Sequence, residues 1–212
     1  DADGAVTGNT RRFGASLDKI QQVVDPRPGE IMFGLNMVVY KGKTIFVGDT
    51  SVNEYPSSEE LAEIAISSAR VVKLFGFVPK VAFVSHSTFG QPLTSRTKHI
   101  KKAVDILKNK DVDFEFDGDM QPDVALNEEY KELYPFSNIV GNANILIMPG
   151  QHSAAISYKM MKSLGETKVI GPLLIGLGQP IEIAPLRSST SEIINLASIA
   201  AYSADVIDYK KN

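Results

Sequence analysis

Short apolar runs alternate with amphipathic helical patterns along almost the whole of this 212-residue chain. Short apolar runs rich in β-branched residues are typical of buried strands, whereas apolar residues at spacings of three and four are typical of helices that cover a sheet. Strands that alternate with helices predict an α/β layered fold with a largely parallel sheet. Strands are expected at residues 32–40, 44–47, 81–84, 114–116, 145–148, 169–177 and 181–184, and helices at about 17–24, 57–75, 95–108, 153–164 and 190–209.

Two local patterns refine this prediction. Lys41-Gly42-Lys43 separates two β-rich runs and predicts a hairpin, so the sheet is expected to be mixed. Ser57 and Glu60 have the spacing of a capping box, in which each side chain bonds the backbone N–H of the other residue at the start of a helix. Gly76 follows the helical stripe and supplies a left-handed stop.

Composition and charge exclude several classes of function. The formal net charge is −3 and the basic residues are scattered, which argues against a nucleic-acid-binding surface. No apolar run reaches the length of a membrane span. The chain has no cysteine, so it can form no disulfide, thiolate nucleophile or cysteine zinc site, and a cytoplasmic location is expected. The three histidines are too dispersed to predict a metal site, and His99, among lysines, is expected to be a solvated helix residue.

Two polar segments are candidate anion-binding sites. Ser85-His86-Ser87-Thr88 follows a buried strand, and ligands of α/β sheets bind beyond the carboxyl ends of strands. These hydroxyls could hold phosphate or carbonyl oxygens, or they could only turn the chain and cap the next helix. Thr10-Arg11-Arg12, near the start of the first helix, offers two guanidinium groups suited to phosphate, although paired surface arginines are often only solvated.

Further motifs follow one another in a fixed order along nearly the whole chain. They are Asp49 with Pro56 to Ala65, Val81 to Gly90, Asp117 to Asp123, Gly141 to Asn144, Tyr158-Lys159, Gly171 to Leu177 and Asn195-Leu196-Ala197. In this order they resemble the phosphate acetyl/butyryltransferase (phosphotransacetylase) family. Thr7 to Arg11 and Tyr134-Pro135-Phe136 are closer to the branch fused to bacterial NADP-dependent malic enzymes than to free-standing transferases.

The resemblance implies a fold and a domain organisation. The family fold has two α/β subdomains around a cleft, related to the isocitrate dehydrogenase-like fold, with a largely parallel mixed sheet and flanking helices. Residues 1–212 would be the C-terminal part of a phosphotransacetylase-like domain. The chain starts without Met, at the end of an expected strand. The upstream part of that domain and a malic enzyme catalytic domain are therefore expected to precede residue 1 in a longer protein.

The resemblance also implies a degenerate transferase site. Working transferases carry Ser-Arg-Gly and then an Asp before the last helix, where the arginine can stabilise the acyl phosphate and the Asp can act as a base. The corresponding positions here are Pro185, Leu186 and Arg187, with Glu192 in place of the Asp and Asp18 in place of another arginine. A polar cleft can still bind CoA after catalysis is lost. No catalytic residue is therefore assigned, and acyl-CoA and phosphate are expected to bind in one cleft bordered by Thr10, Arg11, Arg12, Ser85, Ser87, Thr88, Arg187 and Glu192.

Three functions follow from the resemblance. The leading hypothesis is an acetyl-CoA-sensing regulatory and oligomerisation domain of an NADP-dependent malic enzyme, with acetyl-CoA as effector and further copies of the chain as partners. NADP and a divalent metal (Mg or Mn) would bind only in the separate malic enzyme catalytic domain. The second hypothesis is an active phosphate acetyl- or butyryltransferase, with Arg187 and Glu192 in slightly shifted roles. The third is a purely structural dimerisation module.

Overall fold

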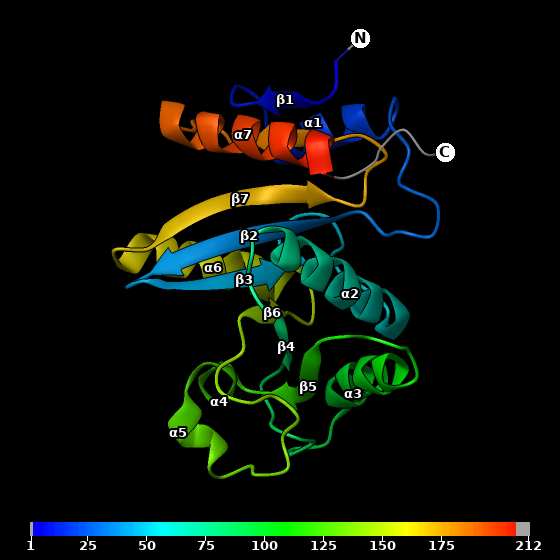
Figure 1. The fold of residues 1–212 in the computed structure, drawn as a ribbon, viewed down its shortest axis with the longest axis vertical. Helices are drawn as coiled ribbons and strands as arrows, with labels where there is room; N and C mark the ends of the chain where they lie inside the picture. Colours follow the sequence, from blue (N-terminus) through cyan, green and yellow to red (C-terminus); the bar gives the residue numbers. More distant parts are fainter. Residues whose placement is uncertain (1, 207–212) are drawn as a thin grey trace.

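A mixed sheet of six strands forms the centre of the computed structural model, which describes residues 2–206 (Figure 1). The strand order is β5-β4-β6-β3-β2-β7. Neighbours among β3, β6, β4 and β5 are parallel, whereas β2 is antiparallel to both β3 and β7. The prediction of a largely parallel, mixed sheet is confirmed. The strands are β2 (Phe33–Tyr40), β3 (Lys43–Gly48), β4 (Lys80–Val84), β5 (Glu115–Met120), β6 (Ile145–Ile147) and β7 (Lys168–Ile175).

The predicted hairpin joins β2 to β3. Tyr40 pairs with Lys43 in an antiparallel register. Lys41 and Gly42 at the turn have φ angles of 47° and 77°, the left-handed conformation that a tight hairpin turn requires. Because β2 runs against β3, the carboxyl ends of β3, β4 and β6 lie at the end of the sheet where β2 begins.

Helices cover both faces of this sheet. Phe33, Phe46 and Phe83 are buried on the face under α2 and α3, and Val47 and Val84 are buried on the face under α4 and α6. Burial of side chains of this size contributes about 1.5–3 kcal/mol each, so the two clusters hold the layers together. The helices are α2 (Ser58–Leu74), α3 (Ser95–Lys108), α4 (Pro122–Leu126), the short α5 (Glu128–Lys131) and α6 (Gln151–Leu164).

The first turn of α2 carries the predicted capping box. The Ser57 hydroxyl accepts a hydrogen bond from the Glu60 N–H at 3.1 Å, and the Glu60 carboxylate accepts one from the Ser57 N–H at 2.6 Å. A second box, between Thr94 and Thr97, begins α3. Gly76, with a φ of 82°, follows the end of α2 as predicted. Backbone donors at the starts of both helices are therefore satisfied by side chains.

A two-stranded sheet with its own helices lies at one end of the molecule (Figure 1). β1 (Ala5–Gly8) runs parallel to β8 (Ile181–Ala184). α1 (Phe13–Ile20) and α7 (Thr190–Val206) pack against these strands, and α7 also contacts β7. In Figure 1 this unit lies at the opposite end of the long axis from α4 and α5, which agrees with the expected pair of α/β units.

Some element boundaries differ from the predictions. The strand predicted at residues 114–116 runs from Glu115 to Met120, because its backbone pairs with β4 along this length. The buried carboxylates of Asp117 and Asp119 accept hydrogen bonds from the Asn138 and Gly90 N–H groups. The helix predicted from Ser153 starts two residues earlier. The last helix is described as far as Val206, and its predicted continuation over 207–209 lies outside the described residues. Within residues 2–206, no helix has the length and apolar character needed to cross a membrane.

Candidate functional site

Two loops leave the same end of the β1–β8 sheet, because the two strands are parallel. The Asn9 N–H donates to the Ala184 carbonyl at 2.9 Å, and the Arg187 N–H donates to the Asn9 carbonyl at 3.1 Å. These bonds hold residues 9–12 beside residues 185–189, and we call this pair of segments the arginine loops.

The backbone of the arginine loops is tightly constrained. Gly8, just before them, has a φ of 102°, and a Cβ there would lie 2.3 Å from the Ala184 carbonyl oxygen. A side chain at this position would therefore separate the two strands. Asn9 and Arg187 have φ angles of 63° and 62°, which non-glycine residues rarely adopt. Such conformations cluster at ligand-binding sites.

The arginine loops present three exposed guanidinium groups, those of Arg11, Arg12 and Arg187. Among residues 2–206, no carboxylate forms an ion pair with any of them. Thr10 is exposed beside them. Guanidinium groups bind phosphate through paired hydrogen bonds, so this surface is suited to an anionic ligand. Leu186, which is 54% exposed, adds an apolar side chain at the same surface.

Glu192, by contrast, is held as a helix cap and an ion-pair partner. Its carboxylate accepts hydrogen bonds from the Ser189 N–H at 2.8 Å and the Ser189 hydroxyl at 3.0 Å, and Lys162 Nζ donates to it at 2.9 Å. The backbone bond from Ser189, followed by the bond from Lys162, lowers the pKa of Glu192 to about 2. A carboxylate with so low a pKa is a weak base near neutral pH, so it is poorly suited to deprotonate a thiol.

Ser87 and Thr88, two of the predicted binding hydroxyls, support a neighbouring loop instead. The buried Ser87 hydroxyl donates to one carboxylate oxygen of Asp119, and the other oxygen accepts from the Gly90 N–H at 3.0 Å. The Thr88 hydroxyl accepts from the Gln121 N–H at 3.2 Å. Both side chains are buried as well as hydrogen-bonded within the chain, so the alternative of a structural turn fits them better.

Ser85 and His86 line a cavity of about 720 Å³ at the carboxyl ends of β4 and β6, which we call the Ser85 cavity. None of its lining residues belongs to the arginine loops. The predicted binding residues follow strands of two different sheets, β4 in the large sheet and β1 and β8 in the separate one, and a single cleft that joins them stays a prediction. The lining residues are Glu54, Tyr55, Val84, Ser85, His86, Ser95, Arg96, His99, Ile100, Pro122, Met148, Pro149, Gly150, His152 and Ser153.

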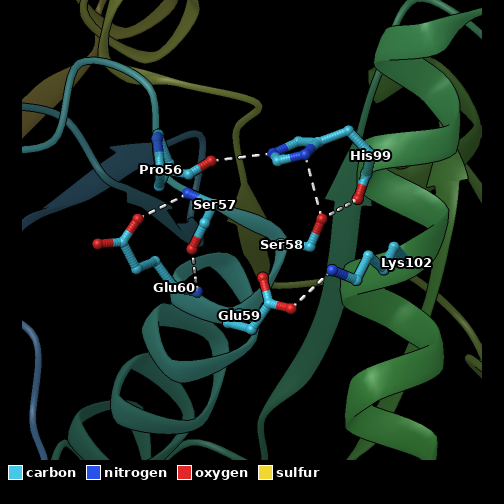
Figure 2. Close-up of polar contacts among 7 residues, drawn as sticks. All are labelled: Pro56, Ser57, Ser58, Glu59, Glu60, His99 and Lys102. Atoms are coloured by element: carbon cyan, nitrogen blue, oxygen red, sulfur yellow. Dashed lines mark hydrogen bonds and ion pairs between the residues drawn. The ribbon is translucent and has the colours of Figure 1, made fainter.

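His99 forms part of the cavity wall and anchors α3 to the start of α2 (Figure 2). Its Nδ1 lies 3.1 Å from the Ser58 hydroxyl, its Nε2 lies 2.9 Å from the Pro56 carbonyl, and the Ser58 hydroxyl donates to the His99 carbonyl at 2.8 Å. Lys102 and Glu59 form an ion pair at 2.7 Å between the same two helices. The prediction of a solvated His99 is wrong, because both ring nitrogens find partners across the helix–helix contact.

Comparison with known proteins identifies the family. The family model for "Phosphate acetyl/butaryl transferase" matches residues 1–201. The chain belongs to this family. A solved structure in it, a phosphotransacetylase from Streptococcus pyogenes, superposes with a TM-score of 0.90 at 31% sequence identity, over 96% of this chain and 63% of that one. The expected phosphotransacetylase fold is thereby confirmed.

The curated relatives of this chain include two different kinds of enzyme. An NADP-dependent malic enzyme of Rhizobium meliloti is 47% identical over 204 residues, which are 96% of this chain and 27% of that protein. A phosphate acetyltransferase of Clostridium acetobutylicum is 34% identical over 212 residues, which are 95% of this chain and 63% of that protein. Within the phosphate acetyl/butaryl transferase family, the chain thus matches both a short segment of a malic enzyme and most of a transferase.

Sequence reasoning missed several residues of the Ser85 cavity. Tyr55, Arg96 and His152 lie in three separate segments, and nothing in their local patterns marks them as neighbours. One local signal is present: Arg96 and His152 lie at the starts of α3 and α6, and helix N-termini favour bound anions.

Proposed function

We propose that this chain is an acetyl-CoA-sensing regulatory domain of an NADP-dependent malic enzyme. The parent reaction would be the oxidative decarboxylation of malate to pyruvate. The match to 27% of a malic enzyme supports this, because a segment of that size leaves room for a separate catalytic domain. NADP and the divalent metal would bind in that catalytic domain, and no residue of this chain is assigned to them.

The observation that carries the proposal is the set of three guanidinium groups on the arginine loops that have no ion-pair partner among residues 2–206. CoA brings a 3′-phosphate and a pyrophosphate, which call for guanidinium groups and loop N–H groups. Arg11, Arg12 and Arg187 supply the former. The thioester end needs only a neutral surface, which Pro185 and Leu186 offer next to Arg187.

An active transferase is the second candidate, favoured by the 34% identity to a phosphate acetyltransferase. The environment of Glu192 argues against it, because a capped and ion-paired carboxylate is a poor base. The family resemblance places an arginine that would stabilise the acyl phosphate at position 186. Leu186 has no charge to supply there. Binding without turnover is therefore the better supported function.

Removing the guanidinium groups tests the acyl-CoA site. Arg11→Ala, Arg12→Ala and Arg187→Ala should each weaken acetyl-CoA binding by about tenfold or more, since a hydrogen bond to a charged group contributes roughly 1.5–3 kcal/mol. The measurement is calorimetry on the full-length protein. Lys19→Ala, an exposed change on α1 outside the loops, is the matched control. Undiminished binding in all three arginine variants would show that acetyl-CoA binds elsewhere, and no binding by the unchanged protein would favour the purely structural module.

We also propose that the chain self-associates through α7. Ile194 is 57% exposed, and Ala197 and Ala201 are exposed at helical spacing from it. Small side chains allow two helices to approach closely. Light scattering should show a dimer, and Ala197→Arg should shift it to a monomer, whereas Ala15→Arg on the exposed face of α1 should not. A monomer at micromolar concentration of the unchanged protein would contradict this interface.

A further inference from the structure

The Ser85 cavity has no part in the acyl-CoA contacts proposed at the arginine loops. Its volume of about 720 Å³ lies in the range of small-molecule sites. It opens at the carboxyl ends of β4 and β6, the end of an α/β sheet where ligands commonly bind. Its walls come from the loop before α2 and from the starts of α3 and α6. The size and position of this cavity are therefore suited to a small-molecule ligand.

Arg96, histidine side chains and hydroxyl groups make up most of its polar lining. Arg96, His86 and His152 line the cavity and are exposed, and the Ser85 hydroxyl adds a donor. Among residues 2–206, no carboxylate pairs with Arg96. Glu54 is the one acidic side chain in the described lining, and it is exposed. Arg96, which has no ion-pair partner among residues 2–206, is therefore suited to an anionic ligand.

The start of α6 contributes backbone donors to the same cavity. Gly150 precedes the helix and provides no side-chain cap, whereas α2 and α3 both have capping boxes. The N–H groups of residues 151–153 consequently have no acceptor in the described part of the chain. A Cβ on Gly150 would lie 2.7 Å from the Glu54 carbonyl oxygen, so glycine lets the loop before α2 close over this helix start. Free N–H groups at a helix start bind phosphate.

The lining of the cavity also contains apolar and aromatic side chains. Tyr55, which is 66% exposed, lines the cavity together with Ile100 and Met148. Its ring centroid lies 6.5 Å from that of His99. The His99 ring is fixed by its bonds to the segment that begins α2 (Figure 2), so this wall is formed before any ligand arrives. An exposed aromatic ring in a cavity that also holds phosphate-binding groups is suited to stack on a nucleobase.

We propose that the Ser85 cavity binds a nucleotide, with its phosphate against Arg96, His152 and the start of α6 and its base against Tyr55. A free adenine nucleotide and the nucleotide half of an acyl-CoA share this chemistry. The inference does not depend on the arginine loops being the acyl-CoA site, because no residue is common to the two places.

Calorimetry on the full-length protein tests the cavity with AMP, adenosine 3′,5′-bisphosphate and inorganic phosphate as probes. Both nucleotides should bind more tightly than phosphate. Arg96→Met should weaken nucleotide binding about tenfold or more, because it removes a charged hydrogen-bond donor. Glu54→Gln should tighten it about two- to fivefold, because it removes a screened like charge. Both side chains are exposed, so neither change should disturb the fold. Lys98→Met, on the same helix but outside the lining, is the matched control.

Competition distinguishes the two sources of the nucleotide. If acetyl-CoA displaces AMP and Arg96→Met weakens both, the occupant is the nucleotide half of an acyl-CoA; if acetyl-CoA binds without displacing AMP, it is a free nucleotide. Failure of both nucleotides to bind at millimolar concentration would overturn the inference, and so would binding that Arg96→Met and Glu54→Gln leave unchanged. If Arg187→Ala loses acetyl-CoA binding but no nucleotide binds at the cavity, the proposed function is supported and the inference about the cavity is wrong.

Discussion

Acetyl phosphate formation from acetyl-CoA and phosphate is expected to be slower than about one turnover per second, the lower end for working enzymes. Loss of one contact to the developing charge typically costs a factor of about 10²–10³ in rate. Here Leu186 replaces the arginine that the family resemblance places at this position, and Asp18 reverses a second charge. Glu192, with a pKa of about 2, adds a base too weak to activate the thiol. The combined loss should leave little activity.

The assay follows acetyl phosphate production by the full-length protein, with the phosphate acetyltransferase of Clostridium acetobutylicum as the active reference. Leu186→Arg should raise any residual rate, whereas Leu186→Met, which changes shape without adding charge, should not. Leu186 is exposed, so neither change should unfold the chain. Turnover of about one per second or faster in the unchanged protein would contradict the regulatory proposal and favour an active transferase.

Local patterns predicted most of the fold because each depends on neighbours in sequence. The hairpin at Lys41-Gly42-Lys43 requires left-handed turn residues, and the box of Ser57 and Glu60 requires two side chains three residues apart. The apolar runs marked the strands because both faces of the sheet are covered by helices. Each of these signals is complete within a few residues.

The candidate site was harder to predict because its contacts join distant segments. The lysine neighbours of His99 predict a solvated side chain, but its ring contacts Ser58 and Pro56, which are 41 and 43 residues away. The position of Ser87 after a buried strand predicts a ligand-binding hydroxyl, but this hydroxyl donates to Asp119, which is 32 residues away. The loop of Arg187 lies beside that of Arg11 and Arg12 because the two loops follow paired strands, whereas the order of strands in the two sheets could not be predicted from any local pattern.

Glu182 is a buried carboxylate with few polar contacts. Its side chain accepts a hydrogen bond from the Leu174 N–H at 3.0 Å, and only 4% of the residue is exposed. Arg27, Arg70 and Tyr202 line the same narrow pocket, but both arginines form ion pairs with Glu30. Burial raises the pKa of Glu182 from 4.5 to about 8, although the Leu174 N–H partly opposes the shift. The carboxyl is therefore protonated in the folded chain at neutral pH.

The free energy of unfolding should fall as the pH rises between about 4.5 and 8. In this window the unfolded chain has released the Glu182 proton and the folded chain retains it, so rising pH favours unfolding. The slope attributable to this group is at most about 1.4 kcal/mol per pH unit, and it vanishes above the folded pKa. Glu192 acts in the opposite direction, but its contribution is lost only as the pH falls from 4.5 towards 2, outside the window.

Urea unfolding of the full-length protein and of Glu182→Gln at pH 5, 6, 7 and 8 measures this effect. Glutamine has nearly the same shape, can still accept from the Leu174 N–H and never ionises, so the variant should lose the pH dependence that Glu182 supplies. Its stability relative to the unchanged protein should therefore rise steadily from pH 5 to pH 8, by more than about 1 kcal/mol overall. Glu54→Gln, an exposed change, should show no such trend. Parallel curves for the unchanged protein and Glu182→Gln would mean that Glu182 is ionised in the folded chain, with water or a cation reaching it.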